Sequence, residues 1–358
     1  MSRGYIRNLI SFYEEKRERK EQRSDVRNCA YIYSLPRNEF LGNYKISPEM
    51  VEYLHEELED DLSPLNSEGY PADIKILTGL RILVNGHYQR GNGQDQNTSL
   101  APTTVSKYLT QFIDAVNRKL KPKWIVFPGS EEARQEVAGG FRQKFGVPNV
   151  IGAIDCTHVS LFPPPGLTKI QYKNRHDYMS INVQLICDAD CRILSCNANY
   201  PGRVHDQFIF NNSLIKDEMR RLYTNRIGDY FLLGDAGYAL EPWLMTPIRN
   251  TQVGSPEARY DNWHCRARNT IERTNGYLKG TFRMLGLDRN IHYAPEKASA
   301  MIYAACTLYN IMRHFRLPME LVAVPAEPVT LYENNNNNNR RLLEIALSKR
   351  HNIVENYF

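Results

Sequence analysis

Apolar positions in the first third of the chain recur at helical spacing. Before them, Glu14–Arg27 mixes both charge signs with only Val26 apolar, and we expect a weakly ordered arm over residues 1–45. Ser47, followed by a proline, is typical of a helix start, and Asp73–Tyr88 and the stretch from Ala101 repeat the helical pattern. We therefore predict a helical domain over residues 46–145. The expected inward positions are Val51, Leu54, Leu58, Ile74, Leu77, Leu80, Leu83, Val105, Leu109, Phe112, Ile113 and Val116.

The last two predicted helices allow two interpretations. They are joined by a polar loop at Gly91–Asn97, and the second begins Thr-Thr-Val-Ser-Lys-Tyr, which is typical of a helix-turn-helix that enters a DNA major groove. A plain helical bundle fits the same apolar pattern. Basic residues near the second helix are few, namely Lys107, Arg118, Lys119 and Lys121.

The periodicity changes after Gly146-Val147-Pro148, where short apolar runs predict strands. A six-asparagine tract at Asn334–Asn339 is typical of a flexible linker. We therefore expect a second domain over residues 146–318 and a tail with an Asn-rich linker over 319–358. The predicted strands are 150–162, Ile181–Asp188, Cys191–Asn199 and 229–235, and the predicted helices are 205–224, 266–287 and 295–315.

The order of these elements is strand, hairpin pair, helix, strand, helix. This is the order of a ribonuclease-H-like fold, so we predict an α/β mixed-sheet catalytic domain behind an N-terminal helical domain. Composition agrees with a globular protein, with 42% hydrophobic and 24% charged residues. The net charge of +5 is mild, so any site for a polyanion must come from local patches.

Other bulk properties narrow the class of protein. No apolar stretch approaches the roughly 18–20 residues that span a bilayer, and the first residues lack the pattern of a secretory signal. The seven cysteines include no Cys-x-x-Cys pair, which suits a reducing compartment. A zinc site at Cys187, Cys191 and Cys196 is an alternative, but no histidine stands near them at ligand spacing, so we expect buried thiols.

Two aspartates each end a short apolar run. Asp155 closes Asn149–Asp155 and Asp235 closes Tyr230–Asp235, and a carboxylate at the end of a buried strand emerges at the edge of a sheet. Burying an unpaired carboxylate is unfavourable, so an aspartate inside an apolar run suggests a functional role such as metal binding. Together with Glu272 on a helix, Asp155 and Asp235 can hold a pair of divalent cations for phosphodiester displacement.

The predicted helix around Glu272 has one apolar and one basic face. Ile271, Leu278, Phe282 and Leu285 form the packing stripe, and Glu272 lies beside it. On the side of Glu272 stand the cations Arg268, Lys279 and Arg283, which suit a metal ion next to DNA phosphates. A solvent-exposed helix with an Arg268–Glu272 ion pair is the plainer interpretation.

Four segments in this order resemble the motifs of PIF/Harbinger transposases, and in particular the harbinger transposase-derived nucleases. The resemblance covers about residues 146–315 well and the preceding helical region more loosely. Its motifs are Ala153–Val159, Val204–Asp206, Gly234–Tyr238 and Ile271–Lys279.

The resemblance implies a DDE nuclease with Asp155, Asp235 and Glu272 as the acidic triad, and Asp206 as an additional metal ligand. From the sequence pattern alone, Asp206 is equally suited to cap the next helix. Relatives commonly carry glycine where this chain has Cys156, so a bulkier side chain must be accommodated beside Asp155.

Several neighbouring residues admit more than one role. His158 and His205 can act as bases or support the metal ligands, and the two-metal mechanism needs neither as a base. In the polar loop after Pro163–Gly166, Lys173, Arg175 and His176 can meet phosphates or be solvated.

We thus predict a metal-dependent DNA endonuclease of transposase ancestry that uses a pair of Mg²⁺ or Mn²⁺ ions. The alternative is a catalytically silent DNA- or protein-binding factor that keeps the fold. The resemblance implies a separate Myb-like DNA-binding partner and a nuclear location, with shuttling to the cytoplasm and homo-oligomerisation as further expectations.

Overall fold

The chain divides into two compact units in the computed structural model, which describes residues 11–14, 17–18, 36–64, 70–86, 100–166, 169–287, 289–324 and 340–358. The first unit is helical and comprises residues 1–120 with 315–318; the second comprises 121–314 with 319–358 and contains the sheet. In the described part of the chain, no helix is both long and apolar enough to cross a membrane.

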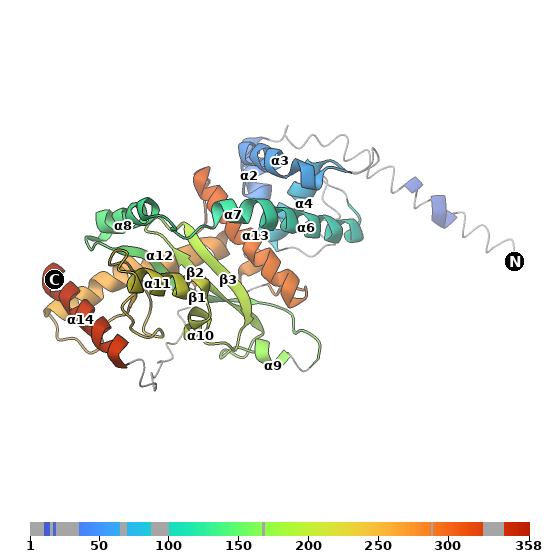
Figure 1. The fold of residues 1–358 in the computed structure, drawn as a ribbon. Coiled ribbons are helices and arrows are strands. Elements are labelled where there is room, and N and C mark those ends of the chain that lie inside the picture. Colours follow the sequence, from blue (N-terminus) through green and yellow to red (C-terminus); the bar gives the residue numbers. More distant parts are fainter. Residues whose placement is uncertain are drawn as a thin grey trace. The chain divides into compact units, whose positions relative to one another are not determined.

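The helical unit buries the apolar positions expected from the sequence. Val51, Leu54, Leu109 and Phe112 are fully buried. The helices α3, α4 and α6 that carry them pack together (Figure 1). α3 starts at the cap residue Ser47, whose side chain accepts a hydrogen bond from Met50 N. The described helices of this unit are α2 (Arg37–Tyr44), α3 (Pro48–Leu62), α4 (Ala72–Asn85), α6 (Pro102–Ala115) and the π-helix η2 (Val116–Leu120).

The helix-turn-helix stays a prediction, since its expected turn at Gly91–Asn97 lies outside the described residues. The expected arm over residues 1–45 ends in packed structure, because α2 buries Phe40 and Tyr44. The Asn334–Asn339 tract also lies outside the described residues.

The second unit is built on a five-stranded sheet in the order β3-β2-β1-β4-β5. β1 pairs antiparallel with β2 and parallel with β4, and β2 pairs antiparallel with β3. This mixed topology agrees with a ribonuclease-H-like domain, and the four predicted strands are all present. The strands are β1 (Val150–Ser160), β2 (Ser180–Cys187), β3 (Ile193–Pro201), β4 (Phe231–Leu233) and β5 (Leu244–Met245).

Helices cover this sheet (Figure 1). α8 and α12 contact each other and β1, α13 contacts β3, and α10 contacts β2. The predicted apolar stripe of α12 and η3 is buried at Ile271, Leu278, Phe282 and Leu285. The helices of this unit are α7 (Lys121–Trp124), α8 (Glu131–Phe145), α9 (Lys169–Tyr172), α10 (Asp206–Asn211), α11 (Leu214–Thr224), α12 (Pro256–Thr281), η3 (Arg283–Leu285), α13 (Pro295–His314) and α14 (Arg340–Tyr357).

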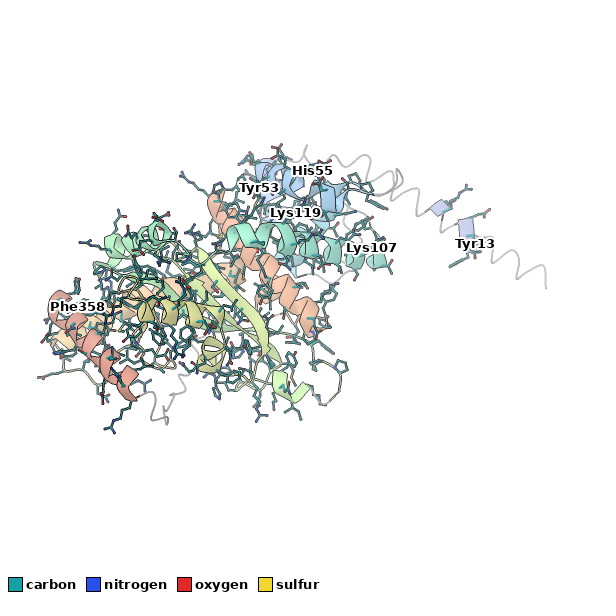
Figure 2. The ribbon with its side chains drawn as sticks, in the orientation of Figure 1. Tyr13, Tyr53, His55, Lys107, Lys119 and Phe358 are labelled. Atoms are coloured by element: carbon teal, nitrogen blue, oxygen red, sulfur yellow. The ribbon has the colours of Figure 1, made fainter. Side chains whose placement is uncertain are left out.

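The boundary between the units differs from the expected one at residue 145. It falls at Leu120, because α8 packs on β1 and so belongs with the sheet. The end of the chain also differs from the expected tail, since α14 packs on α12 and buries Ile353 and Val354. Figure 2 labels the last residue of the chain, Phe358. The centroid of its ring lies 5.5 Å from that of Trp263 in α12.

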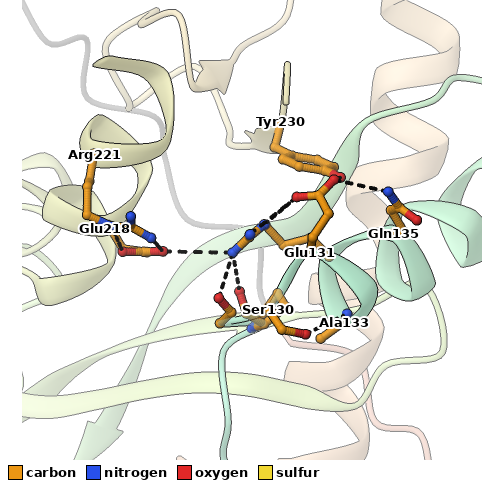
Figure 3. A network of polar contacts seen from close by, with 10 residues as sticks. Ser130, Glu131, Ala133, Gln135, Glu218, Arg221 and Tyr230 are labelled. Atoms are coloured by element: carbon orange, nitrogen blue, oxygen red, sulfur yellow. Dashed lines mark hydrogen bonds and ion pairs between the residues drawn. The ribbon is translucent and has the colours of Figure 1, made fainter. Parts of the chain in front are cut away.

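A polar network joins α8 to α11 and to the residue before β4 (Figure 3). The hydroxyl of Tyr230 donates to Glu131 Oε1 at 2.6 Å, and Glu218 accepts two hydrogen bonds of 2.7 Å from Arg221. The buried guanidinium of Arg134 lies between these groups, 3.3 Å from Glu131 and 4.0 Å from Glu218. The network fixes the start of β4, the strand that leads to Asp235.

Two helical glycines give a test of this packing. A side chain at Gly280 of α12 would lie 2.2 Å from the backbone oxygen of Glu320, whereas one at Gly139 of α8 would meet nothing within 4 Å. We expect Gly280→Ala to lower the free energy of unfolding by about 1–3 kcal/mol, because backbone must move. Gly139→Ala is expected to raise it by about 0.5–1 kcal/mol through helix propensity. Chemical denaturation measures both, and a stabilising Gly280→Ala would contradict the close crossing.

Candidate active site

Asp155 and Asp235 reach the same level of the sheet from neighbouring parallel strands. The last paired residues of these strands are Ala153 and Leu233, so each aspartate follows two residues after the pair. Asp155 lies inside β1 rather than at its end, because β1 continues to pair with β2 as far as Ser160. The two carboxylates lie beyond the last paired residues of β1 and β4, within electrostatic reach of each other.

A third carboxylate joins them from α10. Asp206 is the first residue of this helix and accepts a hydrogen bond of 2.8 Å from Asn182 Nδ2 on β2. The alternative role of Asp206 as a helix cap is wrong, since the N-cap residue is His205 and no side-chain cap bond forms. The sequence therefore brings three aspartates together from β1, the end of β4 and α10.

The electrostatics of these groups show their proximity. Burial raises the pKa of Asp155 well above its ordinary value, and the negative charges of Asp235 and Asp206 raise it further. The pKa of Asp235 is also raised, first by burial and then by Asp206, although a bond from Gly237 N to its Oδ1 opposes the rise. The three acids repel one another when ionised, which is a property of many functional sites.

Arg268 of α12 supplies the opposing positive charge. Its side chain is only 18% exposed, and its charge lowers the pKa of both Asp155 and Asp235 against the effect of burial. Although burial lowers the pKa of Arg268 itself, the carboxylates of Asp155, Glu272 and Asp235 raise it. Arg268 therefore balances part of the charge that the aspartates bring.

Glu272 lies on the same face of α12 and is bound by Arg268 in an ion pair. Its side chain is 49% exposed, so it stands at the solvent side of the site, whereas Asp155, Asp206 and Asp235 are half-buried. The Arg268–Glu272 ion pair of the plainer interpretation is confirmed, but its solvent-exposed helix is wrong, because α12 buries Trp263, Ile271 and Leu278. The charge of Arg268 acts on Glu272, Asp155 and Asp235 alike.

The other two predicted DNA-binding cations differ in environment. Lys279 is buried, and its Nζ donates to the backbone oxygen of His158 on β1 at 2.9 Å. Arg283 lies in η3 beyond the end of α12 and is exposed. Lys279 thus ties α12 to the sheet, while Arg283 faces solvent.

Two asparagines that the sequence did not reveal contact the acids. Asn275 Nδ2 donates to Asp155 Oδ2 at 3.3 Å, as Asn182 does to Asp206. In the described part of the chain, the side-chain oxygen of each asparagine is buried without a hydrogen-bond partner. The only signal in the sequence was the helical spacing that puts Asn275 on the face of Arg268 and Glu272.

The residues beside the acids complete the site. Cys156 is accommodated by Tyr238, whose hydroxyl lies 3.5 Å from its Sγ, and by Gln184 at 3.9 Å. Burial lowers the pKa of His158 to about 4, although Asp206 opposes this, so its imidazole is uncharged at neutral pH. His158 Nδ1 lies 3.0 Å from Ser180 Oγ, while His205 is exposed.

The cysteines considered for zinc lie in or beside β2 and β3. Cys187 and Cys191 are buried, and Cys196 is partly exposed. Across the described ranges, no three His, Cys, Asp or Glu side chains are arranged to hold a metal ion.

Comparison with known proteins identifies the family of this chain. A family model described as DDE superfamily endonuclease matches residues 154–310. The protein named "Putative nuclease HARBI1" from Rattus norvegicus is 30% identical over 274 residues, which cover 76% of each chain. Its Homo sapiens counterpart is 29% identical over the same length. "Protein ALP1-like" from Arabidopsis thaliana is 23% identical over 293 residues, 76% of this chain and 70% of that protein.

No solved structure matches the chain. The relative at 30% identity spans three quarters of both proteins, and the family match begins at Ile154, one residue before Asp155. The chain therefore belongs to the harbinger transposase-derived nucleases, a family of DDE superfamily endonucleases.

Proposed function

We propose that this protein is a metal-dependent DNA endonuclease that hydrolyses phosphodiester bonds with two divalent cations. The observation that carries the proposal is the burial of Asp155 and Asp235 within electrostatic reach of Asp206, which raises the pKa of both carboxyl groups. Half-buried carboxylates that repel one another are unfavourable unless a cation offsets them. Arg268 alone is one charge against three. As these described side chains stand they do not form a group that could hold a metal ion, so a bound cation would have to draw them together.

The donor chemistry at this point suits Mg²⁺ or Mn²⁺. These ions prefer oxygen ligands and retain several waters, so a few carboxylates suffice. The buried side-chain oxygens of Asn275 and Asn182, which lack partners among the described residues, add oxygen atoms beside Asp155 and Asp206. We assign Asp155, Asp206, Asp235 and Glu272 as the metal ligands. When bound, such a pair of cations activates a water and stabilises the leaving oxygen of a phosphodiester.

The chain's own groups would then hold the site and the DNA. Asn275 and Asn182 orient the carboxylates of Asp155 and Asp206 by donating to them. Arg268 keeps Glu272 near the aspartates through its ion pair. Arg268, Lys279 and Arg283 are the proposed DNA-binding residues, with Arg283 exposed at the end of the row.

Glu272→Gln tests the proposal directly. We expect wild-type protein to cut end-labelled duplex DNA with varied ends in the presence of Mg²⁺ or Mn²⁺, and Glu272→Gln to cut at least about tenfold more slowly. A Glu344→Gln variant, exposed on α14, is the matched control and should keep wild-type activity. Cutting that persists in a chelator, or is unchanged in Glu272→Gln, would overturn the two-metal mechanism.

A catalytically silent DNA- or protein-binding factor is the second candidate. The Arg268–Glu272 ion pair favours it, because that pair satisfies the glutamate without a metal ion. Calorimetry separates the two functions: normal DNA affinity with no metal binding at millimolar concentration would support the silent factor.

We also propose that the protein acts in the nucleus, with shuttling to the cytoplasm, and relies on a Myb-like DNA-binding partner. The cations after α6 are already engaged, since Arg118 pairs with Asp61 at 2.6 Å and Lys119 with Asp60 at 3.3 Å (Figure 2 labels Lys119). Arg118 and Lys119 of the helical unit therefore offer little unneutralised positive charge to bind DNA phosphates. A pull-down that recovers only homo-oligomers would count against the partnership.

A further inference from the structure

Two stacked pairs of rings lie where β1 ends and β2 begins. Phe162 stacks on His292 with ring centroids 4.8 Å apart and planes at 26°, and His176 stacks on Tyr178 at 6.3 Å and 20°. The pairs are joined through the backbone, because Leu161 N donates to Met179 O at 3.0 Å. We call Phe162, His176, Tyr178 and His292 the aromatic shelf.

The shelf is exposed where most large apolar side chains of the sheet unit are buried. Phe162 is 55% exposed, and His176 and His292 are exposed as well. Exposed rings grouped in this way are typical of a binding surface. The apolar Phe162 has no role in the core, so a ligand that covers it would gain free energy by removing it from water.

The loop that carries His176 and Tyr178 is held in shape before any ligand arrives. The buried Asn174 accepts hydrogen bonds from His176 N at 2.9 Å and Tyr178 N at 3.3 Å, and it donates to Ser180 Oγ at 3.0 Å. Phe162 is held by the bond from its N to Ile291 O at 2.9 Å. Rings fixed in this way lose little conformational entropy on binding.

Positive charge surrounds the shelf and extends to the carboxylates. Lys169, Arg175 and Arg203 are exposed on or next to the same loop, and Arg203 N donates to Gln171 O. The loop leads directly into β2, where Ser180 accepts from Asn174 and Asn182 donates to Asp206 Oδ1 at 2.8 Å, so it lies beside the candidate active site. A polyanion bound at the carboxylates would therefore continue over the shelf.

We propose that the aromatic shelf binds unpaired nucleotides of a DNA substrate next to the candidate active site. Rings beside cations are the features with which proteins bind single strands, since every base has a flat face that stacks on an aromatic ring. Bases inside a duplex stack on each other and leave no face for these rings. The proposal rests on the proposed function for its substrate class, but not for its test.

The test measures binding without metal ions, so that no cleavage occurs. Wild-type protein is titrated into a blunt duplex and into the same duplex carrying a short single-stranded extension with 2-aminopurine. We expect the extension to tighten binding by about tenfold and to quench the fluorophore by stacking. Phe162→Ala and His176→Ala should each lose most of this gain while binding the blunt duplex unchanged. Phe162→Trp should retain it.

Tyr357→Ala is the matched control, since it removes a ring that is 47% exposed on α14 and should keep the full gain. Equal affinity of the wild type for the two DNAs would overturn the proposal, as would an equal loss for both DNAs in Phe162→Ala. If the protein binds the extension but cuts no DNA, the aromatic shelf is supported and the nuclease function is contradicted. If it cuts blunt duplex without preferring the extension, the nuclease function is supported and the aromatic shelf is contradicted.

Discussion

Asp155→Asn is expected to abolish DNA cleavage and also to stabilise the metal-free protein. Losing a metal ligand removes several kcal/mol of transition-state stabilisation, so the rate should fall by about 10³-fold or more. An amide of the same shape carries no charge, so it avoids the cost of burying a carboxylate and removes the repulsion from Asp235 and Asp206, although it also loses the attraction of Arg268. We expect the free energy of unfolding to rise by about 1 kcal/mol at neutral pH.

The pH dependence of stability gives a second test of Asp155→Asn. A carboxyl whose pKa is raised in the folded state holds its proton more tightly there than in the unfolded chain. The contribution of Asp155 to stability is therefore greatest at low pH and declines as pH rises above the ordinary range of an aspartate. The stability of Asp155→Asn should lack this decline. We expect Mg²⁺ to raise the melting temperature of the wild type, and this rise should be absent in Asp155→Asn.

Thermal denaturation in buffers of rising pH, with and without Mg²⁺, measures both effects. Asp114→Asn, exposed on α6, is the matched control and should leave the melting temperature unchanged. A metal-free Asp155→Asn protein that melts below the wild type would contradict the charge repulsion.

Arg268→Met is expected to have the opposite effect on stability. It removes the cation that balances Asp155 and Asp235 and leaves their carboxylates without it, so the free energy of unfolding should fall by about 3 kcal/mol. Millimolar Mg²⁺ should restore part of this loss, because the ions supply the missing positive charge.

Urea denaturation with and without Mg²⁺ checks this expectation. Arg266→Met removes an exposed arginine two positions earlier on the same helix and should change stability little. Equal losses in the two variants would contradict the role of Arg268 in balancing the aspartates.

Much of the sheet unit could be predicted because its elements have strong local patterns. The four longer runs became β1 to β4, and the apolar stripe around Ile271 is buried. β5 was missed since its pairing with β4 covers two residues, Leu244 and Met245, too few for a pattern. α8 and α14 were missed for a different reason: their charged surfaces obscure narrow buried faces, such as Ile353 and Val354 of α14.

The roles of single side chains depended on contacts that the helical spacing does not fix. Arg268 and Lys279 share one face of α12, yet Arg268 meets Glu272 and the aspartates while Lys279 donates to His158 O. Spacing gives the direction of a side chain relative to its helix axis. Which group it meets depends on how the helix lies on the sheet.

Local sequence determined the strands, the amphipathic helices and the order of the motifs, because periodicity and turn residues act between near neighbours in the chain. It therefore identified Asp155, Asp235 and Glu272 as candidates, whereas Asp206 became one only through the resemblance to the family's motifs. Only the tertiary structure decided that the charges of the three aspartates act on one another and that Glu272 is bound by Arg268 at the solvent side of the site. It also decided that Asn275 donates to Asp155 and Asn182 to Asp206. The reason is that burial and charge act through space, between residues as far apart in the chain as Asp155 and Asn275.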